Sequence, residues 1–158
     1  MILLNPDRRS WLTPLLHLYW RFSRGMTLGV RACVVDADGR LLLIRHSYTP
    51  GWHFPGGGVE VGQTVEEALA MELREEAHVV MTGAPAFCGL FLNARTSRRD
   101  HVALFRVDSF EQPSPFVPTR EIVEAAFFAR EALPEGVTRG TRERIAELFE
   151  GRPRSSHW

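Results

Sequence analysis

Hydrophobic residues along this chain of 158 residues fall into several short runs and one longer periodic block. The short runs are rich in valine, leucine and phenylalanine and end at turn residues, which is typical of buried strands. They cover residues 26–36, 40–46, 83–93, 102–108 and 123–129. In the periodic block, Leu69, Leu73 and Ala77 recur every four residues, which predicts an amphipathic helix from residue 64 to residue 77 that is anchored on a sheet.

The order of these elements predicts an α/β fold. A second helix is expected over residues 138–149, with Thr138 as its cap, after a turn of helix at residues 130–133. Asp38-Gly39, between the first two predicted strands, is a strong signal for a β-hairpin. A mixed sheet between helices, an α/β/α sandwich, accommodates all of these elements.

The two ends of the chain are expected to lie outside the main domain, which we place at residues 25–150. Residues 151–158 are polar and predict a flexible tail. Residues 1–24 predict a helical extension with an apolar face, whose members are Leu12, Leu15, Leu16, Tyr19 and Trp20. This face is expected to pack on the domain or across a homodimer. The alternative is an acidic membrane surface, because arginines stand nearby at positions 8, 9, 21 and 24.

Composition narrows the class of protein. The chain is 44% hydrophobic and 24% charged, which is typical of one globular domain. Its formal net charge is zero, so a basic field for generic nucleic-acid binding is not expected. The N-terminal apolar run is too short to span a bilayer, so no transmembrane segment is expected. Cys33 and Cys88 lie in apolar runs and predict buried free thiols, which fits a reducing cytoplasm.

Candidate chemistry lies in a glycine-rich loop (residues 56–62, the glycine loop) and the helix that follows it. Glu72, Glu75 and Glu76 are spaced i, i+3 and i+4 and therefore share one helical face. Like charges so placed destabilise a helix by roughly 0.2–0.5 kcal/mol per pair unless a cation lies between them. Carboxylates with a nearby backbone carbonyl suit Mg²⁺ or Mn²⁺, so we expect a metal-assisted phosphate enzyme. Thr64 and Glu67 form a capping-box pattern, and the helix N-terminus that they cap would favour phosphate oxygens.

This segment resembles the signature of the Nudix hydrolase family, G-x5-E-x7-R-E-U-x-E-E-x-G-U, in which U is aliphatic. The match begins at Gly57, and six of the nine fixed positions agree. The three departures are Gln63 in place of Glu, Met71 in place of Arg and His78 in place of Gly. The preceding residues 52–56 also look like the family's strand into the loop. The resemblance implies a Nudix-like α/β/α sandwich with a mixed β-sheet over residues 25–150.

The resemblance also implies an activity and a set of site residues. The expected reaction is divalent-metal-dependent hydrolysis of a nucleoside diphosphate linked to another moiety, a small-molecule substrate. The metal is expected at Glu72, Glu75, Glu76 and the carbonyl region of Gly57, with Glu76 as the strongest ligand. Glu72 and Glu75 are the expected catalytic residues, because either is able to help the attacking water. A further acid is expected from one of three positions, Glu60, Glu121 or Glu124.

Substrate contacts are expected at Gly56, Gly57, Arg45 and His53, and the substrate itself is left open. Gln63 lacks the charge of Glu, and Met71 lacks the bond by which the family's arginine orients the neighbouring Glu72. These two departures predict a weakened or specialised enzyme, or alternatively a nucleotide-sensing or partner-binding domain. The arginine-rich loop at residues 95–99 is interpreted either as a solvated loop or as a further phosphate contact.

Overall fold

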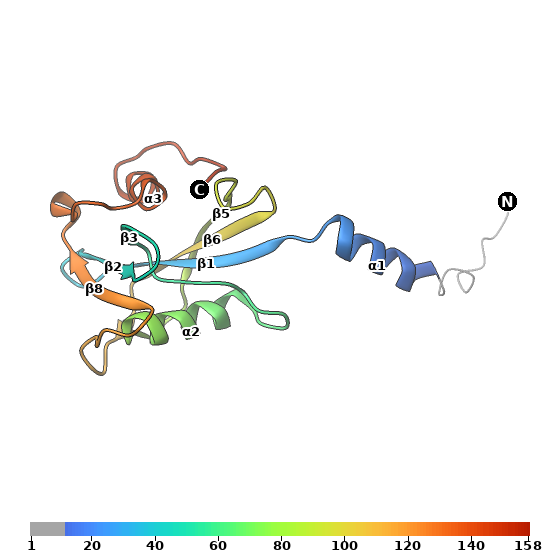
Figure 1. Cartoon of the computed structure of the whole chain (residues 1–158). Helices are drawn as coiled ribbons and strands as arrows, with labels where there is room; N and C mark the ends of the chain where they lie inside the picture. The colour runs from blue at the N-terminus through green and yellow to red at the C-terminus, as the bar shows by residue number, and fades with distance from the viewer. Residues whose placement is uncertain (1–11) are drawn as a thin grey trace.

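The structure, a computed structural model, describes residues 12–158, so Arg8 and Arg9 lie outside the described part. Figure 1 shows strands in the middle of the molecule, with one helix on each side and a third helix projecting away. The elements in chain order are α1 (Leu12–Ser23), β1 (Thr27–Val34), β2 (Leu41–His46), β3 (Trp52–His53), α2 (Val65–Ala77), β4 (Val80–Met81), β5 (Ala86–Leu92), β6 (Asp100–Val107), β7 (Phe110–Glu111), β8 (Ile122–Phe128), η2 (Arg130–Ala132) and α3 (Arg139–Phe149).

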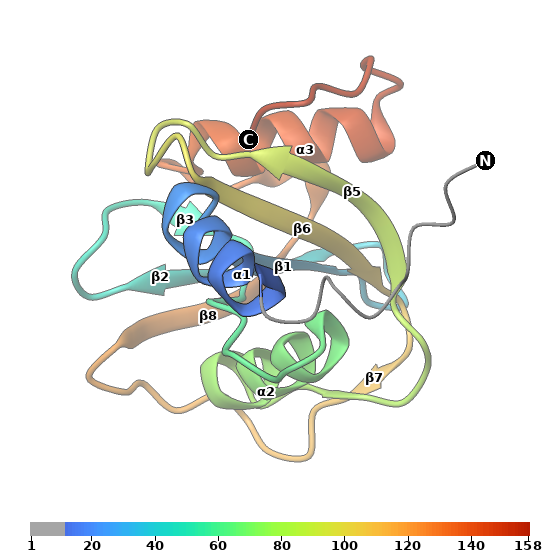
Figure 2. The ribbon, with the colours of Figure 1, turned by 90° about the vertical axis from the view of Figure 1, so that its right-hand side faces the viewer.

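Two three-stranded sheets form the central layer. One has the order β1-β6-β5, in which β1 and β6 are parallel and β5 and β6 antiparallel. The other is antiparallel, with the order β3-β2-β8, and β4 pairs separately with β7. Because α2 and α3 lie on opposite sides of these strands, the predicted α/β/α sandwich with a mixed sheet is confirmed (Figures 1 and 2).

The predicted hairpin between the first two strands was wrong beyond its turn. Gly39 does turn the chain with a φ of 76°, but the strands then meet only where the N–H of Asp36 donates to the Arg40 carbonyl at 3.0 Å and at an isolated bridge between Val35 and Leu41. The glycine loop occupies the edge of β1 instead. The N–H of Val30 donates to the Gly57 carbonyl at 2.8 Å, and the N–H of Ala32 donates to the Pro55 carbonyl at 2.9 Å. β1 therefore positions the loop that carries the candidate site.

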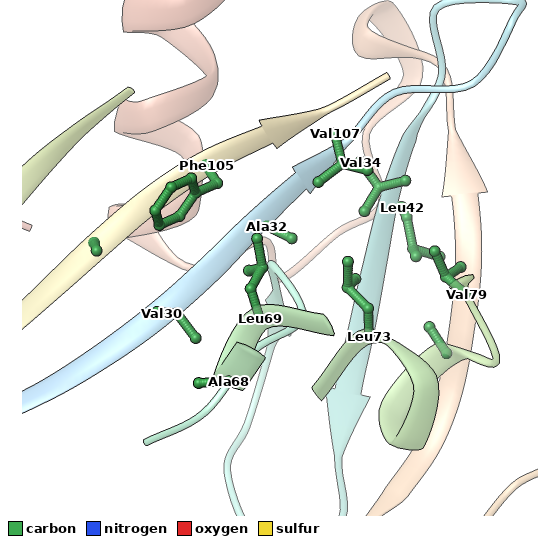
Figure 3. Packing of buried hydrophobic residues seen from close by; sticks show 12 residues of the cluster. Val30, Ala32, Val34, Leu42, Ala68, Leu69, Leu73, Val79, Phe105 and Val107 are labelled. Atoms are coloured by element: carbon green, nitrogen blue, oxygen red, sulfur yellow. The ribbon is translucent and has the colours of Figure 1, made fainter. Parts of the chain in front are cut away.

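Helix α2 packs its apolar stripe on one face of the sheets. Figure 3 shows Leu69 and Leu73 pointing toward Val30, Ala32 and Leu42 of the first two strands. These leucines are fully buried, so the predicted stripe anchors the helix. The predicted capping box is present as well.

The two ends of α2 follow their sequence signals. The Thr64 hydroxyl accepts from the N–H of Glu67, and a Glu67 carboxylate oxygen accepts from the N–H of Thr64 at 2.8 Å. His78 ends the helix in the left-handed conformation, with a φ of 56°, as expected for the position where the resemblance places a glycine.

A second core lies between the opposite face and α3. Its buried members include Leu43, Phe54, Phe91 and Ile145. Cys33 and Cys88 are buried and free, as predicted. Thr138 stands at the start of α3, but its hydroxyl donates to the Thr141 hydroxyl at 2.9 Å and does not cap a backbone N–H.

The segment that we expected to be a flexible tail packs on this second core. The N–H of Leu92 donates to the Ser156 carbonyl, and the N–H of Trp158 donates to the Leu92 carbonyl at 3.0 Å. The fully buried guanidinium of Arg144 donates to the His157 carbonyl and lies over the ring of Phe91. The polar composition of residues 151–158 did not predict these contacts, because they are made by backbone groups and by one tryptophan.

Helix α1 leads away from the sandwich at the start of β1, and Figure 2 views it nearly along its axis. From residue 13 to Ser23 its residues are exposed, so the expected packing of its apolar face on the domain was wrong. In the described part of the chain, no helix is both long and apolar enough to cross a membrane.

Candidate active site

A cavity of about 300 Å³ lies between α2, the end of β2 and the glycine loop. We call it the acidic cavity because three glutamates line it. The ionisable side chains that line it are Arg31, His46, Tyr48, His53, Glu72, Glu76 and Glu121. Gly56 and Gly57 contribute backbone to the same wall, so the structure brings most of the predicted site residues together.

Glu76 is the most deeply placed of the three acids. Its side chain is buried, and one carboxylate oxygen accepts from the N–H of Gly56 at 2.6 Å. The other oxygen is 3.9 Å from Nε2 of His46. Burial raises the pKa of Glu76 to about 8, although the Gly56 hydrogen bond and the charge of Arg31 oppose the rise. A cation bound close to this buried carboxyl group would stabilise its ionised form.

Glu72 lies directly against Gly57. A methyl group built on Gly57 would overlap the carboxylate of Glu72, so this position accepts only glycine while the carboxylate stays in place. Burial raises the pKa of Glu72, Glu75 raises it further, and Arg31 lowers it. Glu75 itself is exposed and does not line the cavity, although it is close enough to affect Glu72.

Of the three candidates for a further acid, the structure brings Glu121 to the cavity. Ligand atoms of Glu121, Glu76 and His46 all lie within 4.8 Å of one another. Glu124 pairs instead with Arg45 at 2.6 Å across β2 and β8, and Glu60 is exposed in the glycine loop. The structure therefore does not bring Arg45, which we expected to contact substrate, to the cavity.

Arg31 is the main residue that the sequence analysis missed. It is half-buried, and its guanidinium donates to the carbonyls of Gly56 and Phe54. Burial lowers the pKa of Arg31, while the charges of Glu76 and Glu72 raise it. A charged residue within the otherwise apolar run of β1 was the signal that could have identified it.

The two histidines of the cavity differ in their partners. Burial lowers the pKa of both His46 and His53, and the charge of Arg31 lowers both further. His53 has a backbone partner, the Pro50 carbonyl, 3.2 Å from Nε2. In contrast, Nδ1 of His46 is buried and has no hydrogen-bond partner among the described residues.

A second cavity of about 510 Å³ adjoins the first and shares Arg31, His53 and Gly57 with it. We call it the outer cavity. Asn93, Arg95 and Arg139 line it, and so does Trp158 from the packed tail. The Trp158 ring lies edge-on to Phe91, with ring centroids 5.7 Å apart. The acidic cavity has space for a phosphate group beside the glutamates, and the adjoining outer cavity has space for a larger group attached to that phosphate.

The N-terminus of α2 does not face this site. The first turn of α2 is absent from the lining of both cavities, and Glu67 already accepts the N–H of Thr64. The expectation that this helix end receives phosphate oxygens therefore stays a prediction, which the lining of the two cavities does not support. The acids come from the later turns of the helix.

The two departures Gln63 and Met71 touch each other outside the acidic cavity. Nε2 of Gln63 donates to the Met71 sulfur at 3.6 Å, and Oε1 of Gln63 accepts from the N–H of Glu60 at 3.0 Å. The resemblance places a glutamate and an arginine at these two positions. The structure therefore shows a neutral contact where an ion pair would otherwise be possible.

The residues present fit a hard divalent cation. Glu72, Glu76 and Glu121 line the cavity with carboxylate oxygens, of which one from Glu76 and one from Glu121 lie within 4.8 Å of each other. Burial opposes the charge of Glu76 unless a cation neutralises it. The Gly57 carbonyl accepts from Val30 and the Gly56 carbonyl from Arg31, so each glycine carbonyl already has a donor. The carboxylates are thus the stronger part of the donor set.

Comparison with known proteins identifies the family. The NUDIX domain model matches residues 25–149, which is most of the chain, so this chain belongs to the Nudix family. The resemblance seen in residues 57–79 is thereby confirmed.

Curated relatives match over part of their length. An RNA pyrophosphohydrolase of Halorhodospira halophila is 43% identical over 67 residues, which are 39% of this chain and 37% of the relative. An ADP-ribose pyrophosphatase of Methanocaldococcus jannaschii is 32% identical over 72 residues, 44% of this chain and 42% of the relative. This chain therefore spans less than half the length of these relatives.

Solved structures match over more of the chain. A MutT Nudix hydrolase from Burkholderia pseudomallei is 25% identical with a TM-score of 0.67, covering 78% of this chain and 98% of that chain. An ADP-ribose pyrophosphatase from Streptococcus suis is 26% identical with a TM-score of 0.60, covering 84% and 95%. Both agree with the sandwich described above.

Replacing Gly57 tests the placement of Glu72. We expect Gly57→Ala to displace the Glu72 carboxylate and to lower Mn²⁺ affinity by roughly tenfold or more, the effect typical of disturbing groups that orient metal ligands. Gly58→Ala is the matched control, because a methyl group there meets no atom within 4 Å. Calorimetric titration of Mn²⁺ measures both, and equal affinities would mean that Glu72 does not hold metal.

The pKa of Glu76 predicts how stability depends on pH in metal-free protein. Its folded pKa of about 8 exceeds the ordinary value of 4.5, so the folded state binds this proton more tightly than the unfolded state. The resulting stabilisation is complete below pH 4.5 and is lost as the pH rises through 8. We expect Tm in a chelator to fall across this window and Glu76→Gln to flatten the fall.

Glu60→Gln is the control for this measurement, because it removes an exposed carboxylate outside the cavity. It should leave the slope of Tm against pH unchanged. An unaltered slope in Glu76→Gln would assign the pH dependence to another group.

Proposed function

We propose that this chain is a divalent-metal-dependent hydrolase that cleaves a phosphoanhydride bond in a nucleoside diphosphate linked to another moiety. The observation that carries the proposal is the continuity of the two cavities, with three glutamates in one and a larger space in the other. The names of the relatives, RNA pyrophosphohydrolase and ADP-ribose pyrophosphatase, agree with this class of reaction.

Glu72, Glu76 and Glu121 would hold the metal, Mg²⁺ or Mn²⁺, with Glu75 at the exposed edge of the same helical face. When bound, the metal supplies charge neutralisation on the phosphates and a lowered pKa for an attacking water. Glu72 is the residue that we propose accepts a proton from that water, because burial and Glu75 raise its pKa. Glu75 stays the second candidate for this role.

Arg31 and His53 are the residues that we propose bind the substrate phosphates. Both line the two cavities, so they stand where the diphosphate would pass from one to the other. The guanidinium of Arg31 offers further N–H donors beside those given to Gly56 and Phe54. Gly56 and Gly57 shape the wall by allowing the backbone to approach the ligand, and Arg45 is left out of the proposed site.

The alternative function is a nucleotide-sensing or partner-binding domain with little turnover. The neutral contact between Gln63 and Met71 favours this alternative, because both positions lack the charged side chain that the family signature has there. Two further expectations stay predictions: a cytoplasmic setting, which the free buried thiols support, and a homodimer, which mass in solution would test.

Assays with ADP-ribose, a UDP-sugar and an RNA bearing a 5′-triphosphate, each with Mg²⁺ and with Mn²⁺, test the proposal. We expect metal-dependent release of a nucleoside monophosphate or of pyrophosphate, and loss of roughly a hundredfold in kcat/KM for Glu76→Gln. Glu60→Gln is the matched control. Nucleotide binding without turnover by any of these compounds would favour the sensing domain.

The Gln63 and Met71 contact predicts a coupled effect on catalysis. Gln63→Glu and Met71→Arg together should form an ion pair and raise metal-dependent hydrolysis, because the arginine can then orient Glu72. Each single substitution places a charge beside a neutral partner and should therefore raise metal-dependent hydrolysis less. Comparing kcat for the four proteins gives the coupling, and strictly additive effects would show that the two positions act independently.

A further inference from the structure

Helix α1 presents an apolar face to which no part of the described chain provides a cover. Its exposed apolar side chains range from 40% to 73% of full exposure. They are Leu15, Leu16, Leu18, Tyr19, Trp20 and Phe22. A contiguous face of this kind on a helix that projects from the domain marks an interaction surface (Figure 1).

The remaining side of this helix is cationic. His17 and Arg21 are spaced i and i+4 on α1, and Arg24 follows directly after the helix, where its N–H donates to the Trp20 carbonyl at 2.8 Å, so the three residues form one narrow polar stripe. The sequence of α1 contains no acidic residue. The guanidinium of Arg24 lies 5.7 Å from the centroid of the Trp20 ring, where the polar stripe meets the apolar face.

The loop between β5 and β6 adds charge at the base of α1. The N–H of Thr27, just after the helix, donates to the carbonyl of Arg99 at 3.0 Å, so the arginine-rich loop lies beside the junction. This basic loop (residues 95–99) contains Arg95, Arg98 and Arg99, all exposed.

The loop and the end of α1 together carry five exposed arginines, and a guanidinium nitrogen of Arg99 would lie 3.9 Å from a methyl group built on Gly25, the residue after Arg24. Within residues 12–158 none of the five forms an ion pair with a carboxylate. Asp100 lies close by, but it accepts from the Thr27 hydroxyl and from the Asn93 amide. In a chain of zero net charge, five arginines beside Asp100 are a local excess of positive charge.

An anionic membrane would contact both the apolar face of α1 and the exposed arginines. Apolar and aromatic side chains insert at the headgroup boundary, while arginines meet lipid phosphates. A second copy of α1 would cover the apolar face but would leave the arginines without counter-charge. A nucleic acid would meet the arginines but would leave the leucines exposed to water.

We propose that α1 and the basic loop form a peripheral membrane-binding element that seats the protein on an anionic lipid surface, with α1 lying in the plane of the interface. Arg95 also lines the outer cavity, whereas Arg98, Arg99 and α1 are absent from the lining of both cavities.

Co-sedimentation of the full chain with lipid vesicles tests the proposal. We expect binding to vesicles of equal parts phosphatidylcholine and phosphatidylglycerol, and binding weaker by roughly tenfold or more to pure phosphatidylcholine. Leu18→Glu should weaken binding to the mixed vesicles. Leu90→Glu is the matched control, because Leu18 and Leu90 are both 53% exposed and Leu90 lies on β5.

The charged half is tested by replacing Arg21 and Arg24 with glutamate, which should weaken binding to the mixed vesicles and leave Tm unchanged. Equal binding to both kinds of vesicle, or none to either, would overturn the proposal. Two other results would also overturn it. One is a dimer in solution that Leu18→Glu converts to a monomer without any vesicle binding; the other is binding to a single-stranded RNA in place of vesicles.

Discussion

Backbone pairing between β1 and the glycine loop is the interaction on which the site depends. The carbonyl of Gly57 is held by the N–H of Val30, and the N–H of Val59 donates to the Leu28 carbonyl at 2.8 Å on the same edge. On its other side the loop gives the N–H of Gly56 to Glu76. One short segment therefore joins the sheet to the acidic helix, and the distance between them follows from ordinary hydrogen-bond lengths.

The charges of the site balance one another around this segment. Glu72 and Glu76 are like-charged neighbours on α2, and Arg31 approaches them from β1. A cation is thus present beside the acids even without metal. Burial nevertheless raises the pKa of Glu76, which indicates that one guanidinium does not offset the loss of water around that carboxyl.

Much of the fold could be predicted from the sequence because its signals are local. The capping box at Thr64, the apolar stripe of α2 and the left-handed ending at His78 depend on residues within a few positions of one another. The hairpin at Asp38-Gly39 failed because strand pairing is decided by competing partners far away in the chain. In this case the parallel partner β6 and the glycine loop take the two edges of β1.

In the site as well, residues close together in the sequence could be predicted, whereas residues brought together only by the fold could not. Spacing along one helix predicted that Glu72 and Glu76 share a face, and the family resemblance added the glycine wall. Sequence alone could not choose Glu121 over Glu124, because the choice depends on where β8 crosses β2 and on the partner that Arg45 takes. Arg31 was missed because a single arginine in an apolar strand reveals its role only when its neighbours in space are known.

The packed position of Trp158 has a practical consequence for work with the recombinant protein. This residue lines the outer cavity while its N–H donates to the Leu92 carbonyl, so its backbone is held at the cavity wall. Any affinity tag or fusion partner joined after Trp158 would start at that wall. Residues added after Trp158 in an expressed protein would therefore change the space that a ligand meets at this wall.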